Sequence, residues 1–365
     1  MKSVRRKTKR VGAKAAAEPR IAKHADNAVD ISRLLNIVAA FPKQKICVVG
    51  DFVLDEYVSG EISRVSREAP ILILRHRHTE AYPGGAANAV NNLADLDAKV
   101  FPVGAVGEDA GGRALLAYFR AKEISVAGIV RSREWVTTTK TRYLAGWTHT
   151  TEQQVLRVDR EPHAPLGPDV QATIATKAQQ LAARTGAVLI SDYGLGAATP
   201  AMVRKLRAKC ITLDSRYRLL EFRDAGVTAA TPNEPEVEAA YHASVGTDRG
   251  KLEELGERAL GEMNLEALVI TRGKDGLSVF QRGKKGVTPP EHIEIFGSDT
   301  PVDVSGAGDT VIAVFTLALA AGATYLEAAH LANYAGGIVV MKRRTATVTR
   351  AELEASLRGA ATESH

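Results

Sequence analysis

Short apolar runs alternate with helix-like patterns over most of this 365-residue chain. The runs are 45–55, 98–107, 187–194, 211–214, 227–234, 267–273 and 277–283, and the helical patterns are 31–41, 86–96, 110–122, 168–183, 200–208, 234–241, 249–263, 309–321 and 325–341. Such alternation predicts an α/β fold in which helices cover both faces of a mostly parallel sheet. Ligands bind such sheets beyond the carboxyl ends of the strands. We therefore expect the functional residues at those ends.

Two segments break the alternation. Residues 56–82 and 136–161 are rich in β-branched and aromatic residues and alternate polar with apolar side chains. This pattern predicts the strands of a small second sheet beside the main body. Because so small a sheet is marginally stable alone, we expect its outer face to carry a ligand or a partner subunit, such as a second copy of the chain.

Basic charge is concentrated at the N-terminus. Residues 1–25 hold nine Lys or Arg and one Glu, whereas the rest of the chain has 39 basic and 41 acidic residues. We expect 1–28 to be a solvated, disordered tail, with an Arg-rich targeting peptide or an anion-binding arm as alternatives. A single domain would then cover 30–355, followed by a short tail over 356–365. The nearly neutral body argues against a nucleic-acid-binding protein.

Hydropathy and cysteine content limit the cellular context. No apolar run of 18 or more residues lacks a charge, which argues against a membrane span. The basic tail has no apolar centre of the kind that a secretory signal needs. Cys47 and Cys210 lie in strand-like runs, and we expect them to be buried, reduced thiols. These features predict a cytoplasmic protein.

A glycine loop at 306–309 precedes a helical pattern that is apolar on nearly every side. Gly306, Ala307 and Gly308 can turn their N–H groups toward one point, and a helix start adds roughly half a positive charge there. Asp309 beside this anion hole is suited to accept the proton of a hydroxyl that attacks phosphorus. The alternative is an Asp N-cap on a Gly-rich turn.

Other phosphate loops and metal motifs do not fit. A GxGxxG fingerprint that starts at Gly306 would need a glycine where Val311 stands, and no GKS or GKT ending occurs. The sequence also lacks HExxH, CxxC and any Cys/His cluster, which argues against a structural zinc site.

Two more polar motifs fall at predicted helix starts. Gly84 and Gly85 permit close backbone approach, and Asn88 could point from the first helical turn into a site. Asn233 and Glu236 are three residues apart, and Glu236 could hold a Mg²⁺-bound water, since Mg²⁺ keeps several waters and takes few carboxylates. The alternatives are an ordinary Gly-Gly turn and a capped helix with an acidic first turn.

Together, the motifs GG-x-x-N at 84–88, N-x-x-E at 233–236 and D-x-x-G-A-G-D at 303–309 resemble those of the ribokinase-like (PfkB) carbohydrate kinases. They occur in the family's order and spacing, and the resemblance covers about residues 44–350. It implies a Rossmann-like α/β body with a small β lid. It also implies a kinase that uses ATP and Mg²⁺ to phosphorylate a sugar or sugar phosphate.

Within this family the chain is most similar to the kinases of heptose 7-phosphate. The similar stretches are 48–70, 82–96, 137–145, 189–194, 231–236 and 303–310. The chain departs from that group at Leu195, where a lysine is usual, and at Ser215 and Arg216, where the group has Pro-Lys. Loss of a cation weakens a phosphate site, so we expect Leu195→Lys to lower the KM of a phosphorylated acceptor. A fructokinase, ribokinase or nucleoside kinase, and a non-catalytic sugar or nucleotide sensor, stay open as alternatives.

The resemblance also assigns roles to individual residues. Asp309 would be the general base, and in the catalytic loop that starts at Gly306 the N–H groups of Ala307, Gly308 and Asp309 would stabilise the phosphoryl group during transfer. The sugar would be held by Asp51, Asp55, Gly85, Asn88, Lys140 and Arg142. The nucleotide would be held by Asn233, Arg216, Thr271, Gly273, Gly276 and Asn333, and Mg²⁺ by Glu236.

Overall fold

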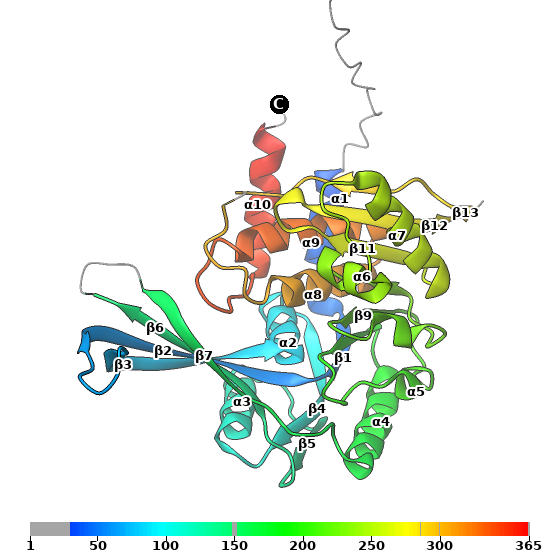
Figure 1. The fold of residues 1–365 in the computed structure, drawn as a ribbon. Helices are drawn as coiled ribbons and strands as arrows, with labels where there is room; N and C mark the ends of the chain where they lie inside the picture. The colour runs from blue at the N-terminus through cyan, green and yellow to red at the C-terminus, as the bar shows by residue number, and fades with distance from the viewer. Residues whose placement is uncertain (1–29, 148–151, 285, 299, 364–365) are drawn as a thin grey trace, which may run out of the picture.

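A long sheet forms the centre of the molecule in a computed structural model that describes residues 30–147, 152–284, 286–298 and 300–363 (Figure 1). Its strands are β1 (Lys45–Gly50), β4 (Lys99–Gly107), β5 (Ile129–Ser132), β8 (Ala187–Asp192), β9 (Ile211–Ser215), β10 (Ala229–Ala230), β11 (Ala267–Thr271), β12 (Leu277–Gly283), β13 (Gly286–Val287) and β14 (Glu291–Ile293). Their order is β13-β12-β11-β10-β9-β8-β1-β4-β5, with β14 paired to β12. Strands from β5 to β11 run parallel, whereas β12 is antiparallel to β11. The α/β prediction is confirmed.

Helices cover both faces of this sheet. One face packs against α1 (Ile31–Ala39), α2 (Ala86–Asp95), α3 (Ala110–Ala121), α8 (Ala307–Ala320), α9 (Tyr325–Val339) and α10 (Arg350–Glu363). The other packs against α4 (Pro168–Ala182), α5 (Pro200–Val203), α6 (Glu234–Tyr241) and α7 (Arg249–Glu262). In β1, Ile46 and Val48 face the first group, while Cys47 and Val49 face the second. Burial on both faces explains why the strand is apolar from Ile46 to Val49.

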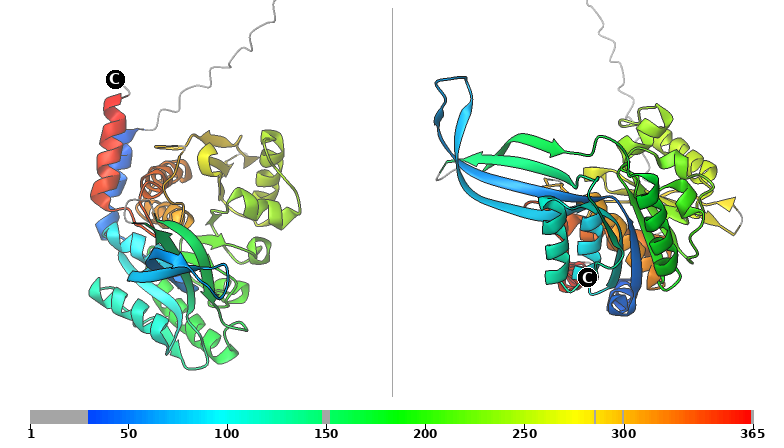
Figure 2. Two further views of the ribbon diagram at one scale, coloured as in Figure 1. Left: turned by 60° about the vertical axis from the view of Figure 1, so that its left-hand side comes forward. Right: turned by 90° about the horizontal axis from the view of Figure 1, so that it is seen from below.

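A second sheet projects from one end of the body (Figures 1 and 2). It contains β2 (Phe52–Val65), β3 (Leu72–Gly85), β6 (Thr138–Gly146) and β7 (Gln153–Arg160), in the order β3-β2-β6-β7. The predicted small sheet is therefore present, and we call it the lid. The predicted strand 45–55 is in fact two strands, because the chain leaves the body sheet at Asp51 and continues into the lid.

Several predicted boundaries are wrong. The strand expected over 227–234 shortens to β10, because Pro232 has no N–H to donate to a sheet. The helix expected over 200–208 ends at Val203, after which the chain bends and Leu206 packs into the core. The domain extends past residue 355, because α10 reaches Glu363 and buries Leu357 against the core that includes α1 (Figure 2). The predicted tail 1–28 lies outside the described residues.

The described helices and cysteines can be compared with the predicted cellular context. No described helix has both the length and the apolar character needed to cross a bilayer. Cys47 is buried, Cys210 is half-buried, and neither forms a disulfide. Burial raises the pKa of the Cys47 thiol to about 12, and burial with the nearby Glu266 charge raises that of Cys210 to about 11. Both thiols are therefore uncharged near neutral pH.

Candidate active site

Polar side chains meet beyond the carboxyl ends of the parallel strands, where the lid joins the body. They surround a cavity of about 440 Å³, which we call the polar pocket. Its lining residues are Val53, Asp55, Gly85, Lys140, Arg142, Tyr193, Asp214, Arg216, Thr231, Asn233, Glu236, Thr271, Val304, Ser305, Gly306, Gly308 and Asp309. Most of the predicted site residues are thus brought together from α6, α8, the strand ends and the lid.

Asp309 lies in the first turn of α8 and is 4% exposed. Each of its carboxylate oxygens accepts a hydrogen bond: Asn88 Nδ2 donates to Oδ2 at 3.0 Å, and the Tyr193 hydroxyl donates to Oδ1 at 3.0 Å. Burial raises the pKa of Asp309 to about 7, and these two bonds oppose that rise. A carboxylate with this pKa is suited to accept a proton near neutral pH.

The loop before α8 has the shape that an anion site needs. Gly306, with φ of 77°, is the N-cap of α8, so Asp309 is not the cap and that alternative is wrong. A Cβ on Gly306 would lie 2.4 Å from Asn88 Nδ2, which explains the glycine. The Ala307 N–H donates to the Val304 carbonyl within the loop. The N–H groups of Gly308 and Asp309 belong to the first helical turn, where no intrahelical acceptor exists.

The geometry does not support the prediction that Asn88 holds the sugar. Asn88 is fully buried, and its Nδ2 donates to Asp309 and, at 3.3 Å, to the Gly306 carbonyl. Its Oδ1 accepts a bond from Asn92 Nδ2 at 3.1 Å. Because these partners use both ends of the amide, Asn88 holds Asp309 and the anion loop in place.

Asp51 likewise does not face the polar pocket. Its buried carboxylate accepts three backbone hydrogen bonds, from the N–H groups of Tyr193 at 2.8 Å, Leu195 at 3.0 Å and Ala197 at 2.9 Å. Burial nevertheless raises its pKa to about 6. With its oxygens committed to these donors, Asp51 fixes the loop after β8, and the prediction that it grips sugar hydroxyls is not supported.

The lid contributes the predicted Asp55, Lys140 and Arg142 to the pocket wall. Arg142 Nη1 donates to Asp55 Oδ1 at 2.6 Å, and the Thr345 hydroxyl donates to Asp55 Oδ2 at 3.1 Å. Lys140 Nζ lies 5.6 Å from the centre of the Tyr193 ring. Burial and the nearby Arg216 lower the pKa of Lys140. Asp55 therefore neutralises Arg142, whereas Lys140 is a cation with another cation beside it.

Leu195 lies away from the polar pocket. Its half-buried side chain packs against the apolar cluster on the α4 and α7 face of the sheet. A lysine at this position would extend from the same side of the loop, which faces the apolar cluster and not the polar pocket. The prediction that Leu195→Lys adds a cation to the acceptor site therefore has no support in this geometry.

Asn233 and Glu236 both cap a helix and line the polar pocket, so the two interpretations of their motif do not exclude each other. Each side chain accepts the backbone N–H of the other residue, which is a capping box at the start of α6. Glu236 also lines the polar pocket, and burial raises its pKa. Asp214 lines the same pocket, where burial and Glu236 raise its pKa. Negative charge is thus costly on this wall.

The same wall fits a hydrated divalent cation. Within the described residues, no group of three His, Cys, Asp or Glu side chains lies close enough to enclose a metal ion. Mg²⁺ needs no such cage, because it keeps several waters and is held by one or two carboxylates together with substrate phosphates. Glu236 would hold it through a water, and its charge would offset the repulsion among the acidic groups.

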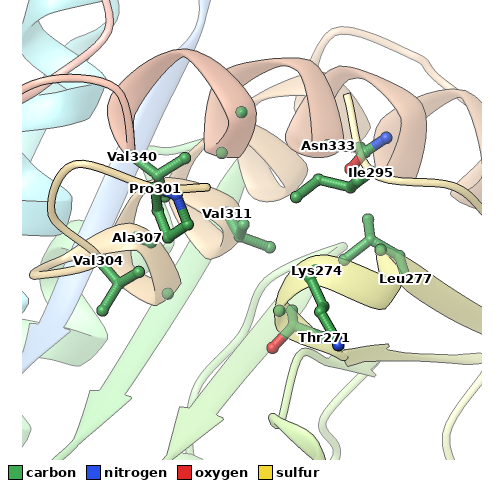
Figure 3. Close-up of a pocket in the computed structure, with 15 residues that line it drawn as sticks. Thr271, Lys274, Leu277, Ile295, Pro301, Val304, Ala307, Val311, Asn333 and Val340 are labelled. Carbon is green, nitrogen blue, oxygen red and sulfur yellow. The ribbon is translucent and has the colours of Figure 1, made fainter. Parts of the chain in front are cut away.

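A second cavity of about 250 Å³ adjoins the first, and we call it the apolar pocket (Figure 3). It is lined by Thr271, Gly273, Lys274, Gly276, Leu277, Ile295, Pro301, Val304, Ala307, Gly308, Val311, Asn333, Gly336, Gly337 and Val340. Figure 3 shows Val311 and Asn333 across the gap from Lys274 and Leu277. Asn333 Nδ2 donates to the Glu294 carbonyl at 2.7 Å. The predicted nucleotide residues Thr271, Gly273, Gly276 and Asn333 therefore share one cavity. Asn233 and Arg216, which are also predicted to hold the nucleotide, line only the polar pocket.

Sequence reasoning gave no role to three residues that the structure places at the site. Tyr193 bonds Asp309, Asp214 lines the polar pocket, and Thr345 bonds both Asp55 and, at 3.0 Å, the Tyr57 hydroxyl. The position of Asp214 at a strand end was a usable signal. Thr345 lies in a loop far along the chain from Asp55, and nothing in its local sequence marks it.

Comparison with known proteins supports these motifs. A family model described as pfkB family carbohydrate kinase matches residues 43–351. The Bifunctional protein HldE of Geobacter sulfurreducens is 39% identical over 318 residues, which cover 85% of this chain and 62% of that protein. HldE of Desulfatibacillum aliphaticivorans is 37% identical over 333 residues, with coverages of 88% and 64%. The chain thus spans a little under two thirds of the length of these relatives.

Solved structures agree on the fold. Arabidopsis thaliana ribokinase complexed with ribose and ATP superposes with a TM-score of 0.63 at 16% identity, covering 86% of this chain and 99% of the other. Escherichia coli phosphofructokinase-2 in complex with potassium gives a TM-score of 0.68 at 15% identity, with coverages of 87% and 99%. With the family match over most of its length, the chain belongs to the pfkB family of carbohydrate kinases.

Proposed function

We propose that this protein transfers the γ-phosphoryl group of ATP to a hydroxyl of a sugar phosphate, and that heptose 7-phosphate, phosphorylated at its anomeric hydroxyl, is its best acceptor. The observation that carries this proposal is the position of Asp309. It lies at the helix start that borders both pockets, with each carboxylate oxygen fixed by a donor. An acceptor hydroxyl in the polar pocket would meet Asp309 beside the anion loop.

The chain's own groups support each part of the transfer. Asp309 takes the proton from the acceptor hydroxyl, whose oxygen forms a bond to the γ-phosphorus as the bond to the leaving ADP oxygen breaks. The N–H groups of Gly308 and Asp309 stabilise negative charge on the transferred group. Mg²⁺, held through Glu236 and water, would neutralise charge on the phosphates. Adenine would occupy the apolar pocket.

Two cations in the polar pocket favour an acceptor that already carries a phosphate. Arg142 is paired with Asp55, but the described residues give neither Lys140 nor Arg216 an ion pair. Both lie near the Tyr193 ring, at 5.6 Å and 6.0 Å from its centre. Charge-assisted bonds from such groups are the strong ones in phosphate recognition. The heptose-kinase pattern in residues 48–70 and the HldE relatives support heptose as the sugar.

The lid supports a proposal about assembly. Val155, Leu156 and Val158 of β7 are 46–56% exposed, so this strand presents apolar side chains to solvent. We propose that two copies associate through the lids and that the protein works in the cytoplasm, where its free thiols stay reduced. Light scattering after size-exclusion chromatography tests the first point: a dimer supports it, and a monomer at micromolar concentration contradicts it.

Turnover with a panel of acceptors tests the function. ATP consumption is measured with heptose 7-phosphate, fructose 6-phosphate, free fructose, ribose and a nucleoside, and ³¹P NMR identifies the phosphorylated position. We expect heptose 7-phosphate to give the highest kcat/KM and an anomeric phosphate. If a free sugar gives a higher kcat/KM than every sugar phosphate, the assignment of heptose 7-phosphate as the acceptor is wrong, and only the assignment as a kinase remains. If no acceptor is phosphorylated, the result favours the alternative that the protein is a non-catalytic sugar or nucleotide sensor.

A further inference from the structure

Tyr193 occupies a central position that no motif assigns to it. Its hydroxyl donates to Asp309 Oδ1 at 3.0 Å. Its ring lines the polar pocket, with Lys140 and Arg216 near the ring centre. The side chain therefore touches the general base at one end and faces the two unpaired cations along the ring.

The backbone around Tyr193 is fixed from several sides. Asp51 accepts the N–H groups of residues 193, 195 and 197. The side chain of Asp192 accepts the Gly194 N–H at 3.2 Å and is itself bonded to Ser215 and paired with Arg218. Because buried carboxylates hold this loop at several points, the Tyr193 hydroxyl is directed at Asp309 before any ligand binds.

We propose, on the basis of the function proposed above, that Tyr193 is a positioning residue for the general base. Its hydroxyl and the Asn88 amide hold the two oxygens of Asp309 and so prevent rotation of the carboxylate about its Cβ–Cγ bond. Each oxygen keeps a second lone pair, so one remains available for the acceptor hydroxyl. Tyr193 acts through Asp309 and does not itself exchange a proton with the acceptor.

The protonation of both partners fits this role. Burial and the neighbouring Asp309 raise the pKa of Tyr193 well above its ordinary value, so the hydroxyl keeps its proton and always donates. Its bond opposes the rise of the Asp309 pKa that burial causes. Tyr193 therefore helps to keep Asp309 ionised.

The other charged groups around Asp309 determine how its pKa changes when the Tyr193 hydroxyl is removed. Asp214 and Asp55 also raise the pKa of Asp309, and Glu236 faces it across the pocket. The cations Lys140, Arg142 and Arg216 line the same pocket. If the Tyr193 hydroxyl is removed, the acidic neighbours and the burial remain while one stabilising bond is lost. The pKa of Asp309 then rises, and activity at low pH is lost earlier.

Tyr193→Phe tests the proposal, because it removes one oxygen atom and keeps the ring. We expect kcat at about pH 7 to fall roughly tenfold and the acid limb of the kcat–pH profile to move up by roughly one pH unit, as for loss of a hydrogen bond to a charged group. The KM of ATP should change less than about twofold, because Tyr193 does not line the apolar pocket that we propose for adenine. Tyr217→Phe is the matched control, because this tyrosine follows the neighbouring strand β9 and is 72% exposed.

A second variant and the wild type separate the outcomes. Replacement of Tyr193 by 3-fluorotyrosine keeps the ring and makes the hydroxyl a stronger donor to Asp309 Oδ1, so it should keep kcat near the wild-type value and move the acid limb slightly down; it also serves if the phenylalanine variant folds poorly. An unchanged acid limb in Tyr193→Phe, or a loss confined to KM, overturns the role of Tyr193. Absence of turnover in the wild type with every acceptor would instead overturn the kinase itself.

Discussion

The two adjoining pockets share a border but differ in chemistry. The apolar pocket contains one charged side chain, Lys274, among aliphatic residues and glycines. The polar pocket contains the acids Asp55, Asp214, Glu236 and Asp309 together with Lys140, Arg142 and Arg216. Thr271, Val304 and Gly308 line both. A flat base suits the first cavity, whereas a hydroxyl-rich, charged acceptor suits the second, so phosphoryl transfer belongs at the border between them.

The two pockets also differ in the interactions that fix their shape. The apolar pocket depends on close backbone approach: a Cβ on Gly337 would lie 2.1 Å from the Phe296 carbonyl. The polar pocket depends on carboxylates that are bonded by neutral donors. Asn88, Tyr193 and Thr345 each donate to an acid there. The following substitutions test the helix start beside the two pockets, the loop behind the polar pocket and the polar pocket itself.

Gly306→Ala should reduce both stability and catalysis, because Gly306 is the N-cap of the helix that carries Asp309. A non-glycine residue with φ of 77° costs about 1–2 kcal/mol. The new Cβ would also displace Asn88, which holds Asp309. We expect a lower melting temperature and a loss of kcat of at least about tenfold. Gly261→Ala, in a helix with open space around the added methyl group, is the control. Wild-type kcat in Gly306→Ala would show that Asn88 is not needed to place the base.

Asp51→Asn should mainly reduce stability, because it acts behind the polar pocket. With its oxygen at the Oδ2 position, the amide keeps the bonds from Tyr193 and Leu195 but turns an NH₂ group toward the Ala197 N–H, at a cost of roughly 1–3 kcal/mol in the free energy of unfolding. Urea denaturation of this variant and of the exposed control Asp169→Asn measures the difference. If Asp51→Asn keeps its stability but loses affinity for the sugar, the original assignment of Asp51 to the sugar is restored.

Lys140→Met should act on the polar pocket alone. We expect the KM of a phosphorylated acceptor to rise roughly tenfold, because one charge-assisted contact is lost. The KM values of ATP and of an unphosphorylated sugar should stay near those of the wild type, as should all constants of Lys43→Met, a substitution at an exposed position. An equal loss for phosphorylated and free sugars would show that Lys140 does not bind the acceptor's phosphate.

Leu195→Lys should have the smallest effect on catalysis. Because this side chain packs on the core side of its loop, the lysine cannot reach the acceptor without moving the loop. We expect kcat/KM for a phosphorylated acceptor within about twofold of the wild type and a small loss of stability, since a half-buried apolar side chain is replaced. A clear fall in KM would mean that the loop turns residue 195 into the polar pocket when substrate binds.

Much of the fold and part of the site could be predicted from local pattern. The βα alternation needs only periodicity, and the loop at Gly306 needs only glycines before an apolar helix. The roles of Asp51, Asn88 and Leu195 could not be predicted in this way. Each depends on which groups from distant segments reach the side chain: the loop after β8 for Asp51, the start of α8 for Asn88, and the core beside α4 for Leu195.

Asp309→Asn tests the central claim most directly, because it removes the base and leaves both pockets in place. Turnover of the best acceptor and the Kd of ATP, from isothermal titration calorimetry, are measured on the same preparation. We expect kcat to fall by about 10²–10⁴, the usual contribution of a general base. The Kd of ATP should change little, because the anion loop keeps its N–H groups. Near-full turnover would contradict the assignment of Asp309 as the base of phosphoryl transfer.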